Sequence, residues 1–298
     1  MMDLTLRRRY FAEEFEAVCR LRSPQLVNAF AMVPREQYLG PGPWTVLAES
    51  PFMASGGAVA GAGLGLRVTP DADPGRVYHN IAIAIDPARQ LFNGQPGTLA
   101  VWIDTLDLAP GARVLHVGSG LGYYTAVIAQ AVGSSGRVVA YEVDEALAAG
   151  AKRNLASTPW VEVRCGDSSD VSHEIFDAIM INAGVTHPLD VWLDALAPGG
   201  RMILPLTSTM PGMGPTLGKG LVFVLTKQDD GSLAARVLAV VAVYSAVGLR
   251  DEQLGAVLGK AMMGGPARWQ EVKRLRRDGH DPDASCWLHA SNCCLSMT

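Results

Sequence analysis

The sequence predicts an α/β fold in which helices cover both faces of a doubly wound, mostly parallel sheet. Short β-rich segments alternate with helical segments between residues 112 and 206, and this alternation is typical of βαβ units. A glycine-rich string directly follows the first β-rich segment. Hydrophobic residues make up 49% of the 298 residues, which is enough to bury a sheet on both faces.

Seven β-rich segments are expected to form the sheet. They span residues 113–117, 137–142, 161–164, 176–181, 201–206, 219–226 and 235–244. Helices are expected between them at residues 123–132, 145–155 and 188–196. The last two strands are predicted to form a hairpin, because the Asp229-Asp230-Gly231 string between them is typical of a tight turn.

Helical segments precede the sheet, and an extension follows it. Two early stretches repeat apolar residues at helical spacing, namely Tyr10, Phe11, Phe15, Val18 and Leu21, and then Leu26, Val27, Phe30 and Val33. Further helices are expected at residues 98–108 and 251–262. We therefore expect three parts: an N-terminal segment that covers a substrate, a ligand-binding core and a C-terminal extension, at residues 1–110, 111–245 and 246–298.

Charge and composition exclude several classes of protein. Only 18% of the residues are charged and the formal net charge is -4, so the chain is neither disordered nor basic enough to indicate a nucleic-acid or membrane partner. Its five cysteines are an odd number, which fits a reducing compartment better than a disulfide framework. No apolar run reaches the roughly 20 residues of a spanning helix. We expect a soluble, cytoplasmic protein of unknown oligomeric state.

The glycine-rich string lies between a predicted strand and a predicted helix and reads Val117-Gly118-Ser119-Gly120-Leu121-Gly122-Tyr123. Glycines at such a turn let the backbone approach a ligand closely, and the start of the helix presents unpaired N–H groups. The pattern is typical of sites for nicotinamide dinucleotides, and it also occurs in sites for S-adenosylmethionine (SAM). A structural turn without a ligand is the alternative.

Polar residues follow the next three strands. Glu142 ends the second strand, where a carboxylate can accept hydrogen bonds from ribose hydroxyls. Gly166 and Asp167 follow the third strand, where a carboxylate can receive an adenine amino group, and Asn182 begins the loop after the fourth. Because ligands of open α/β sheets bind beyond the carboxyl ends of the strands, these residues predict one nucleoside site. For the loop from 182 to 188, a simple strand-to-helix connection is the alternative.

Several strings resemble class I SAM-dependent methyltransferases, and above all the protein-L-isoaspartate (D-aspartate) O-methyltransferase family. They read RVLHVGSGLGYYTAVIA, VVAYEVDEALAAGAKRNL, VRCGD, FDAIMINAGVTHP and LAPGGRMILPL. MVPREQYLGPGPW at 32–44 and NGQPGTLAVWIDTLDLAPG at 93–111 extend the likeness over residues 24–245. The resemblance implies a Rossmann-like, seven-stranded fold with an N-terminal helical segment and a C-terminal extension. It also implies methyl transfer from SAM to a carboxylate, at an isoaspartyl or related site in a protein or peptide.

The resemblance also implies roles for individual residues. In the family the glycine loop holds the methionine part of SAM, the acid after the second strand holds the ribose, and the Gly-Asp pair holds adenine. The implied cofactor-binding residues are His116, Gly118, Ser119, Gly120, Gly122, Tyr123, Glu142, Val143, Gly166, Asp167 and Asn182. The segment before the loop is expected to close over the sulfonium and receive the substrate carboxylate through Asn93, Gly94, Gln95 and Thr98.

Two positions depart from the family pattern. Gly94 stands where the family usually has a serine with a catalytic role, and His116 stands where it has an acid. An ionised carboxylate has a pKa near 4 and needs no general base at neutral pH, so the loss of the hydroxyl leaves the chemistry possible. A hydroxyl or amine acceptor would need a base, for which His79 and His187 are the candidates.

Other functions stay open at this point. One is a SAM-dependent methyltransferase of a small metabolite or of an aspartate in a modified peptide, which the altered residue Gly94 favours. Another is a non-catalytic SAM-binding module, which both departures together suggest. A nicotinamide-dependent dehydrogenase is disfavoured, because the sequence shows no convincing proton-transfer dyad.

The C-terminal tail contains residue types that bind metals. Cys286 and His289 have a Cys-x-x-His spacing, and Cys293 and Cys294 follow. No second pair lies at zinc-finger distance, and buried free cysteines are common. The sequence therefore predicts no metal site, with zinc as the alternative.

Overall fold

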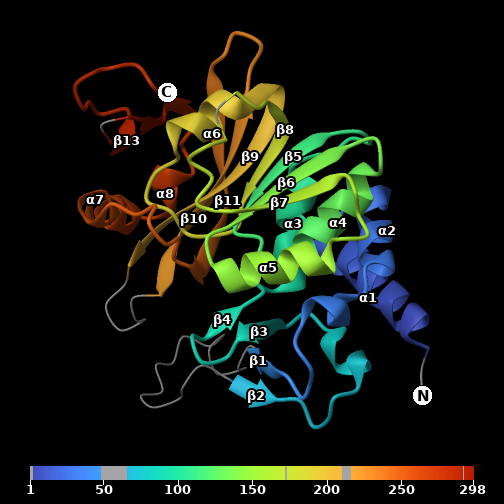
Figure 1. Ribbon diagram of the computed structural model, residues 1–298. Coiled ribbons are helices and arrows are strands. Elements are labelled where there is room, and N and C mark those ends of the chain that lie inside the picture. Colours follow the sequence, from blue (N-terminus) through green and yellow to red (C-terminus); the bar gives the residue numbers. More distant parts are fainter. Residues whose placement is uncertain (1–2, 48–65, 172, 210–215, 291) are drawn as a thin grey trace.

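Two β-sheets organise the chain, and Figure 1 shows the smaller one as a separate layer below the larger. The computed structural model describes residues 3–47, 66–171, 173–209, 216–290 and 292–298. The larger sheet has ten strands in the order β13-β14-β12-β11-β10-β9-β8-β5-β6-β7, and the smaller has four in the order β2-β1-β3-β4. No helix in the described ranges combines the length and apolarity needed to cross a bilayer.

The seven predicted strands are confirmed as the main part of the larger sheet. They are β5 (Arg113–Val117), β6 (Arg137–Glu142), β7 (Val161–Cys165), β8 (Phe176–Ile181), β9 (Leu196–Thr209), β10 (Leu217–Lys227) and β11 (Leu233–Tyr244). In the order β9-β8-β5-β6-β7, each strand pairs in parallel with the next. Strand β10, in contrast, pairs antiparallel with both β9 and β11. The predicted hairpin between β10 and β11 is therefore also confirmed.

The C-terminal extension lengthens this sheet beyond the seven predicted strands. It contributes β12 (Arg274–Arg276), β13 (Cys286–His289) and β14 (Cys294–Ser296), after α7 (Glu252–Met263) and α8 (Pro266–Trp269). Strand β12 pairs antiparallel with β11, and β14 lies between β12 and β13. These strands are too short to produce a recognisable alternation in the sequence.

Helices cover both faces of the larger sheet, as the doubly wound prediction requires. Successive strand residues enter opposite cores, because side chains alternate across a sheet. Val114 packs in the core with α1 (Leu4–Cys19), α2 (Pro24–Met32), α3 (Pro96–Thr105) and α4 (Tyr123–Val132). Leu115 packs in the other core with Trp192 of α6 (Asp190–Ala195) and Leu258 of α7. Helix α5 (Glu145–Asn154) contributes Ala151 to the first core.

The N-terminal helices form where their spacing predicts, with two differences. Tyr10 and Val18 of α1 are 54% and 72% exposed, because α1 buries only a narrow stripe centred on Phe11 and Phe15. Helix α3 ends at Thr105 rather than near residue 108. Asp107 lies just after this end and has a left-handed φ of 57°, which an α-helix cannot accommodate.

The smaller sheet supports the segment that leads into α3. Its strands are β1 (Thr45–Leu47), β2 (Leu66–Val68), β3 (Ala82–Asp86) and β4 (Leu91–Phe92), and their pairs are antiparallel. The short helices η1 (Arg35–Tyr38) and η2 (Pro74–Val77) lie beside it in the sequence. Because β4 ends at Phe92, residues 93–95 form the link between this sheet and α3.

His116 is the next-to-last residue of β5 and is fully buried. Its Nδ1 forms a 2.9 Å hydrogen bond with Thr125 Oγ1 of α4, and its Nε2 has no partner. Burial lowers the pKa of His116 to about 4, so the ring is neutral in the folded protein at neutral pH. The prediction that His116 contacts a ligand is wrong, because its place in the strand directs it into the core beside α4.

The buried imidazole makes stability depend on pH. The unfolded chain binds a proton at His116 below about pH 6.5, whereas the folded chain does not until about pH 4, so stability falls as pH falls through this window. Between about pH 7 and about pH 4.5 the expected loss from this residue is about 2 to 3 kcal/mol. His116→Gln should lose correspondingly less over the same interval in urea unfolding. His173→Gln, at an exposed position, is the control, and equal losses in His116→Gln and the parent would contradict the prediction.

Candidate functional site

A cavity of about 1290 Å³ lies at the carboxyl ends of the parallel strands. Its walls come from the loops after β5, β6, β7 and β8, from the segment before α3, and from the end of β11. Most of the residues predicted from the sequence line it, namely Asn93, Gly94, Gln95, Thr98, Gly118, Ser119, Gly120, Tyr123, Glu142, Val143, Gly166, Asp167 and Asn182. The structure therefore brings the residues between 93 and 98 together with the residues of the glycine loop and the strand ends, from which the sequence separates them by about 20 residues or more.

The glycine loop is held against the ends of its neighbouring strands. The N–H groups of Gly118 and Ser119 both donate to the carbonyl of Tyr141 at the end of β6, at 2.9 and 3.0 Å. Gly118 has a φ of +80°, and a Cβ there would lie 3.2 Å from the carbonyl oxygen of Asn182. Glycine is needed at this position because the backbones of two loops approach closely in a left-handed conformation.

Gly122 does not line the cavity, which corrects its predicted role in ligand contact. Its φ is +94°, and a Cβ would lie 2.8 Å from Leu155 Cδ1. It precedes α4 as the N-cap residue. The third glycine therefore allows the tight turn into α4 and its packing beside the end of α5.

Glu142 places a nearly buried carboxylate at the end of β6. Its Oε2 accepts a hydrogen bond from the Gly120 N–H at 2.7 Å, and its Oε1 accepts one from the Asp144 N–H at 3.1 Å. Each carboxylate oxygen can accept more than one hydrogen bond. Glu142 is therefore oriented by two backbone groups and still has capacity for the hydroxyls of a bound molecule.

Asp167 and Asn182 complete the edge formed by the strand ends. Hydrogen bonds from the Ser169 hydroxyl and backbone amide hold the pKa of Asp167 below its usual range, so this carboxylate is ionised at neutral pH. Gly166, beside it, has a φ of +153°. The Asn182 backbone N–H donates to the carbonyl of Val117 at 2.8 Å, which fixes the start of the loop after β8 to the end of β5.

Four polar atoms at the cavity have no partner among the described residues. They are Asn93 Nδ2, Ser119 Oγ, the Tyr123 hydroxyl and Ser245 Oγ, all in residues that line the cavity and all buried. Buried polar atoms in proteins are nearly always hydrogen-bonded, and exceptions indicate a functional role or a bound group. The four atoms are therefore candidates for contacts with a ligand.

Gly94 has a conformation that favours glycine. Its φ is +81°, and a Cβ would lie 2.8 Å from Leu99 Cδ2 at the start of α3. Its carbonyl oxygen accepts a 3.1 Å hydrogen bond from the Tyr124 hydroxyl. The position where the resemblance implies a serine is thus built around a residue without a side chain.

Arg35 is a buried cation whose role the sequence did not reveal. It is 0% exposed, and its guanidinium donates to the carbonyls of Val77, His79 and Ile81 at 2.7, 3.1 and 2.8 Å. It also donates to Asn93 Oδ1 at 3.3 Å. A single arginine thus connects η1 to the backbone of residues 77–81 and to Asn93, which follows β4. The sequence around it, MVPREQYL, also contains Glu36 and Gln37, so it gave no signal that Arg35 would be buried.

Arg35 also defines which end of the Asn93 amide is free. Asn93 Oδ1 accepts from both Arg35 and the Ile83 N–H, the latter at 3.0 Å. Because these two donors identify the oxygen, the atom without a partner is the donor Nδ2.

No histidine is among the described residues that line the cavity. His79 and His187, the candidate bases, both lie outside its lining. Burial raises the pKa of the lining residue Tyr38 to about 12, so its hydroxyl stays protonated at neutral pH. Among the described residues, the lining therefore offers no histidine as a general base.

Comparison with known proteins agrees with the resemblance seen in the sequence. Residues 69–248 match the family model of protein-L-isoaspartate(D-aspartate) O-methyltransferase. A protein-L-isoaspartate O-methyltransferase of Aeropyrum pernix is 39% identical over 146 residues, which are 47% of this chain and 53% of the relative. One of Syntrophobacter fumaroxidans is 33% identical over 183 residues, 60% of this chain and 69% of the relative. The chain spans only about half the length of several such relatives.

Solved structures show the same fold. A protein-L-isoaspartate O-methyltransferase structure superposes with a TM-score of 0.57 at 23% identity, over 85% of this chain and 69% of the other. A Plasmodium falciparum structure of the same family, in complex with S-adenosyl-L-homocysteine, has a TM-score of 0.56 at 18% identity, over 80% and 97% of the two chains. The family model alone covers more than half of the sequence, and the chain therefore belongs to the protein-L-isoaspartate(D-aspartate) O-methyltransferase family.

Proposed function

We propose that the protein transfers a methyl group from SAM to a carboxylate of a protein or peptide, with an isoaspartyl side chain as the first acceptor to test. The observation that carries this proposal is that the acids at the strand ends and the segment 93–98 line one cavity. Family membership supports the same reaction.

The residues at the cavity fit SAM. Its two ribose hydroxyls are donors, which suits the oriented carboxylate of Glu142, and its adenine amino group suits the ionised Asp167. The unpartnered Ser119 hydroxyl lies in the glycine loop, where it suits the charged methionine end. The cavity of about 1290 Å³ exceeds the roughly 300–1,000 Å³ of a typical small-molecule site, so room remains for an acceptor.

This assignment also suggests roles for the three parts of the chain. Residues 111–245 supply the strand ends that hold the nucleoside, and residues 1–110 supply segment 93–98, which would cover the acceptor. The two parts share one hydrophobic core, so the covering segment is held firmly beside the strand ends.

SAM supplies an electrophilic methyl group on a sulfonium. The protein's contribution would be to hold a carboxylate in line with it, and orientation of this kind contributes about 7–11 kcal/mol in favourable cases. Asn93 is suited to this task, because Arg35 and the Ile83 N–H fix its amide and leave Nδ2 free to donate. Absence of a histidine from the described lining is compatible with the reaction, because the acceptor is ionised without help.

Methylation of a synthetic isoaspartyl peptide tests the proposal directly. The full chain, the peptide and labelled SAM should yield a base-labile methyl ester, and the matched peptide with normal aspartate should yield much less. Calorimetry with S-adenosylhomocysteine is run in parallel. Nucleoside binding without ester on any carboxylate peptide would refute methyl transfer to peptides, and absence of binding would refute the whole assignment.

Gly94 favours a second candidate acceptor. Its backbone is left-handed, and a Cβ there would lie 2.8 Å from Leu99 Cδ2. The position therefore has no hydroxyl where the family has one, and the pocket differs in shape at the acceptor. An aspartate in a modified peptide is the alternative, and it belongs in the same assay as a separate arm. Ester formation there and not on the isoaspartyl peptide would select the second candidate.

Glu142→Gln should weaken binding of S-adenosylhomocysteine by roughly 10- to 100-fold, as expected for loss of hydrogen bonds to a charged group. The substitution keeps the size of the side chain and removes its charge. Glu145→Gln, in the first turn of α5 and outside the cavity lining, is the matched control and should bind normally. Equal affinities in calorimetry for Glu142→Gln and Glu145→Gln would remove the ribose assignment.

Asn93→Asp should lower kcat/KM for the methyl acceptor by about 10²-fold, similar to the loss of one donor from an oxyanion site. The new carboxylate can still accept from Arg35 and Ile83, but it offers the acceptor an oxygen instead of an N–H. Affinity for S-adenosylhomocysteine should stay within a few-fold of the parent value. An unchanged kcat/KM would show that Asn93 does not contact the acceptor.

A further inference from the structure

We infer that His280, Cys286, His289 and Cys294 form a structural zinc site in the C-terminal extension. One ligand atom from each residue lies within 4.8 Å of every other. Four ligands around zinc, at distances of about 2.0 to 2.3 Å, are about 3.3 to 3.8 Å from one another in a tetrahedron. The cluster therefore needs only a small contraction to surround the ion.

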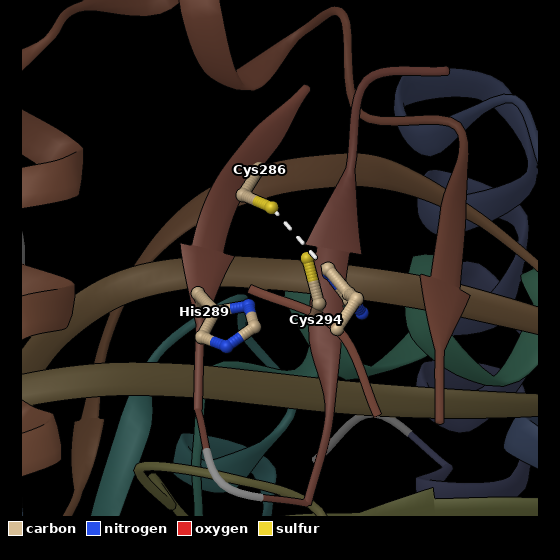
Figure 2. A group of neighbouring side chains, drawn as sticks. Cys286, His289 and Cys294 are labelled. Carbon is tan, nitrogen blue, oxygen red and sulfur yellow. Dashed lines mark hydrogen bonds between the residues drawn. The ribbon is translucent and has the colours of Figure 1, made fainter. Parts of the chain in front are cut away.

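The hairpin of β13 and β14 positions three of the four residues. Figure 2 shows Cys286 and His289 on one strand and Cys294 on the next, with their side chains directed toward one another. His289 and Cys294 are direct cross-strand partners. An antiparallel pair holds such side chains about 4.5–5.5 Å apart at Cβ, so the hairpin itself sets most of the geometry.

His280 joins the cluster from the loop after β12. Its Nδ1 lies 2.9 Å from the carbonyl oxygen of Asp278, and its Nε2 lies 3.5 Å from Cys286 Sγ. A backbone carbonyl can only accept, so Nδ1 donates and the lone pair is on Nε2. A carbonyl that fixes the tautomer of a histidine in this way is the usual outer-shell partner of a metal ligand.

Two further observations fit a metal site. The Asp283 N–H donates to Cys286 Sγ at 3.4 Å, and hydrogen bonds to sulfur are common around metal-bound thiolates. His289 Nδ1 is buried and has no hydrogen-bond partner among the described residues. A buried ring nitrogen without a partner beside two thiols and a second imidazole is costly unless a ligand satisfies this group of atoms.

The donor set selects the ion and its role. Two sulfurs and two imidazoles in a tetrahedral arrangement are typical of zinc. Four protein ligands leave no open position, which is typical of structural rather than catalytic zinc. None of the four residues lines the cavity, and all of them follow residue 248, where the family match ends. The site is therefore separate from methyl transfer.

The sequence alone did not reveal this site. The spacing is His-x5-Cys-x2-His-x4-Cys, which lacks the two short pairs of a zinc finger. His280 had no role in the sequence prediction, and Cys293 competed with Cys294 as a ligand. The fold resolves both points, since it brings His280 into the cluster and leaves Cys293 out of it.

Metal content and metal titration of the full chain test the inference. Protein purified under reducing conditions without chelator should contain one zinc per chain by elemental mass spectrometry. The chelated protein should rebind one Zn²⁺, and with Co²⁺ it should show the intense ligand-field bands of a tetrahedral site together with thiolate charge-transfer absorption. Removal of zinc should lower Tm, because binding to the folded state stabilises it.

Neighbouring cysteines provide a matched pair of variants. Cys294→Ala and Cys293→Ala make the same chemical change, the loss of a thiol, at adjacent buried positions. Only Cys294→Ala should weaken Zn²⁺ binding, by at least about 100-fold. His280→Gln, at a partly exposed position, should show the same loss with the fold intact by circular dichroism.

Three results would overturn the inference. They are substoichiometric zinc in the reduced parent protein, equal Zn²⁺ affinity in Cys293→Ala and Cys294→Ala, and octahedral Co²⁺ spectra. A Cys286–Cys294 disulfide that persists under mild reductant and excludes Zn²⁺ would also overturn it. These readouts are independent of methyl transfer, so failure of the proposed function would leave the result unaffected.

Discussion

The common edge at which the parallel strands end is the constraint on which the candidate site depends. Because β5, β6, β7 and β8 run in the same direction, the loops that follow them meet at one side of the sheet. Paired N–H groups of Gly118 and Ser119 then anchor the first loop to Tyr141, and Gly120 orients Glu142. The parallel strand ends and these backbone hydrogen bonds are enough to position the residues of a nucleoside site at this edge.

The N-terminal segment adds the second half of the cavity, and a buried cation connects the two. Arg35 is fully buried, and four oxygens of the polypeptide accept hydrogen bonds from its two terminal nitrogens, whereas its Nε has no partner among the described residues. Burying an unsatisfied charge would cost several kcal/mol, so the carbonyls of residues 77–81 and Asn93 must stay where they are. This need ties the link before α3 to η1 and keeps the segment 93–98 beside the glycine loop.

The C-terminal extension has a different physical basis. It adds three short strands at the far edge of the sheet from β7, and strands of three or four residues contribute little stability by themselves. The four metal-ligand side chains gather within this small region. A bound ion would cross-link the loop after β12 to the β13–β14 hairpin, which the adjacent apolar contacts of Trp287 and Leu288 reinforce.

The sequence by itself determined the seven main strands, the helices between them and a set of site residues of which most line the cavity. These follow from local signals: alternating apolar runs, glycines at a strand-to-helix turn, and acids at strand ends. Only the tertiary structure decided that His116 faces α4, that Gly122 packs near Leu155, that Arg35 holds Asn93, and that His280 meets Cys286. Each of these depends on the direction of a side chain or on partners distant in the chain or joined by an irregular loop, which no local pattern records.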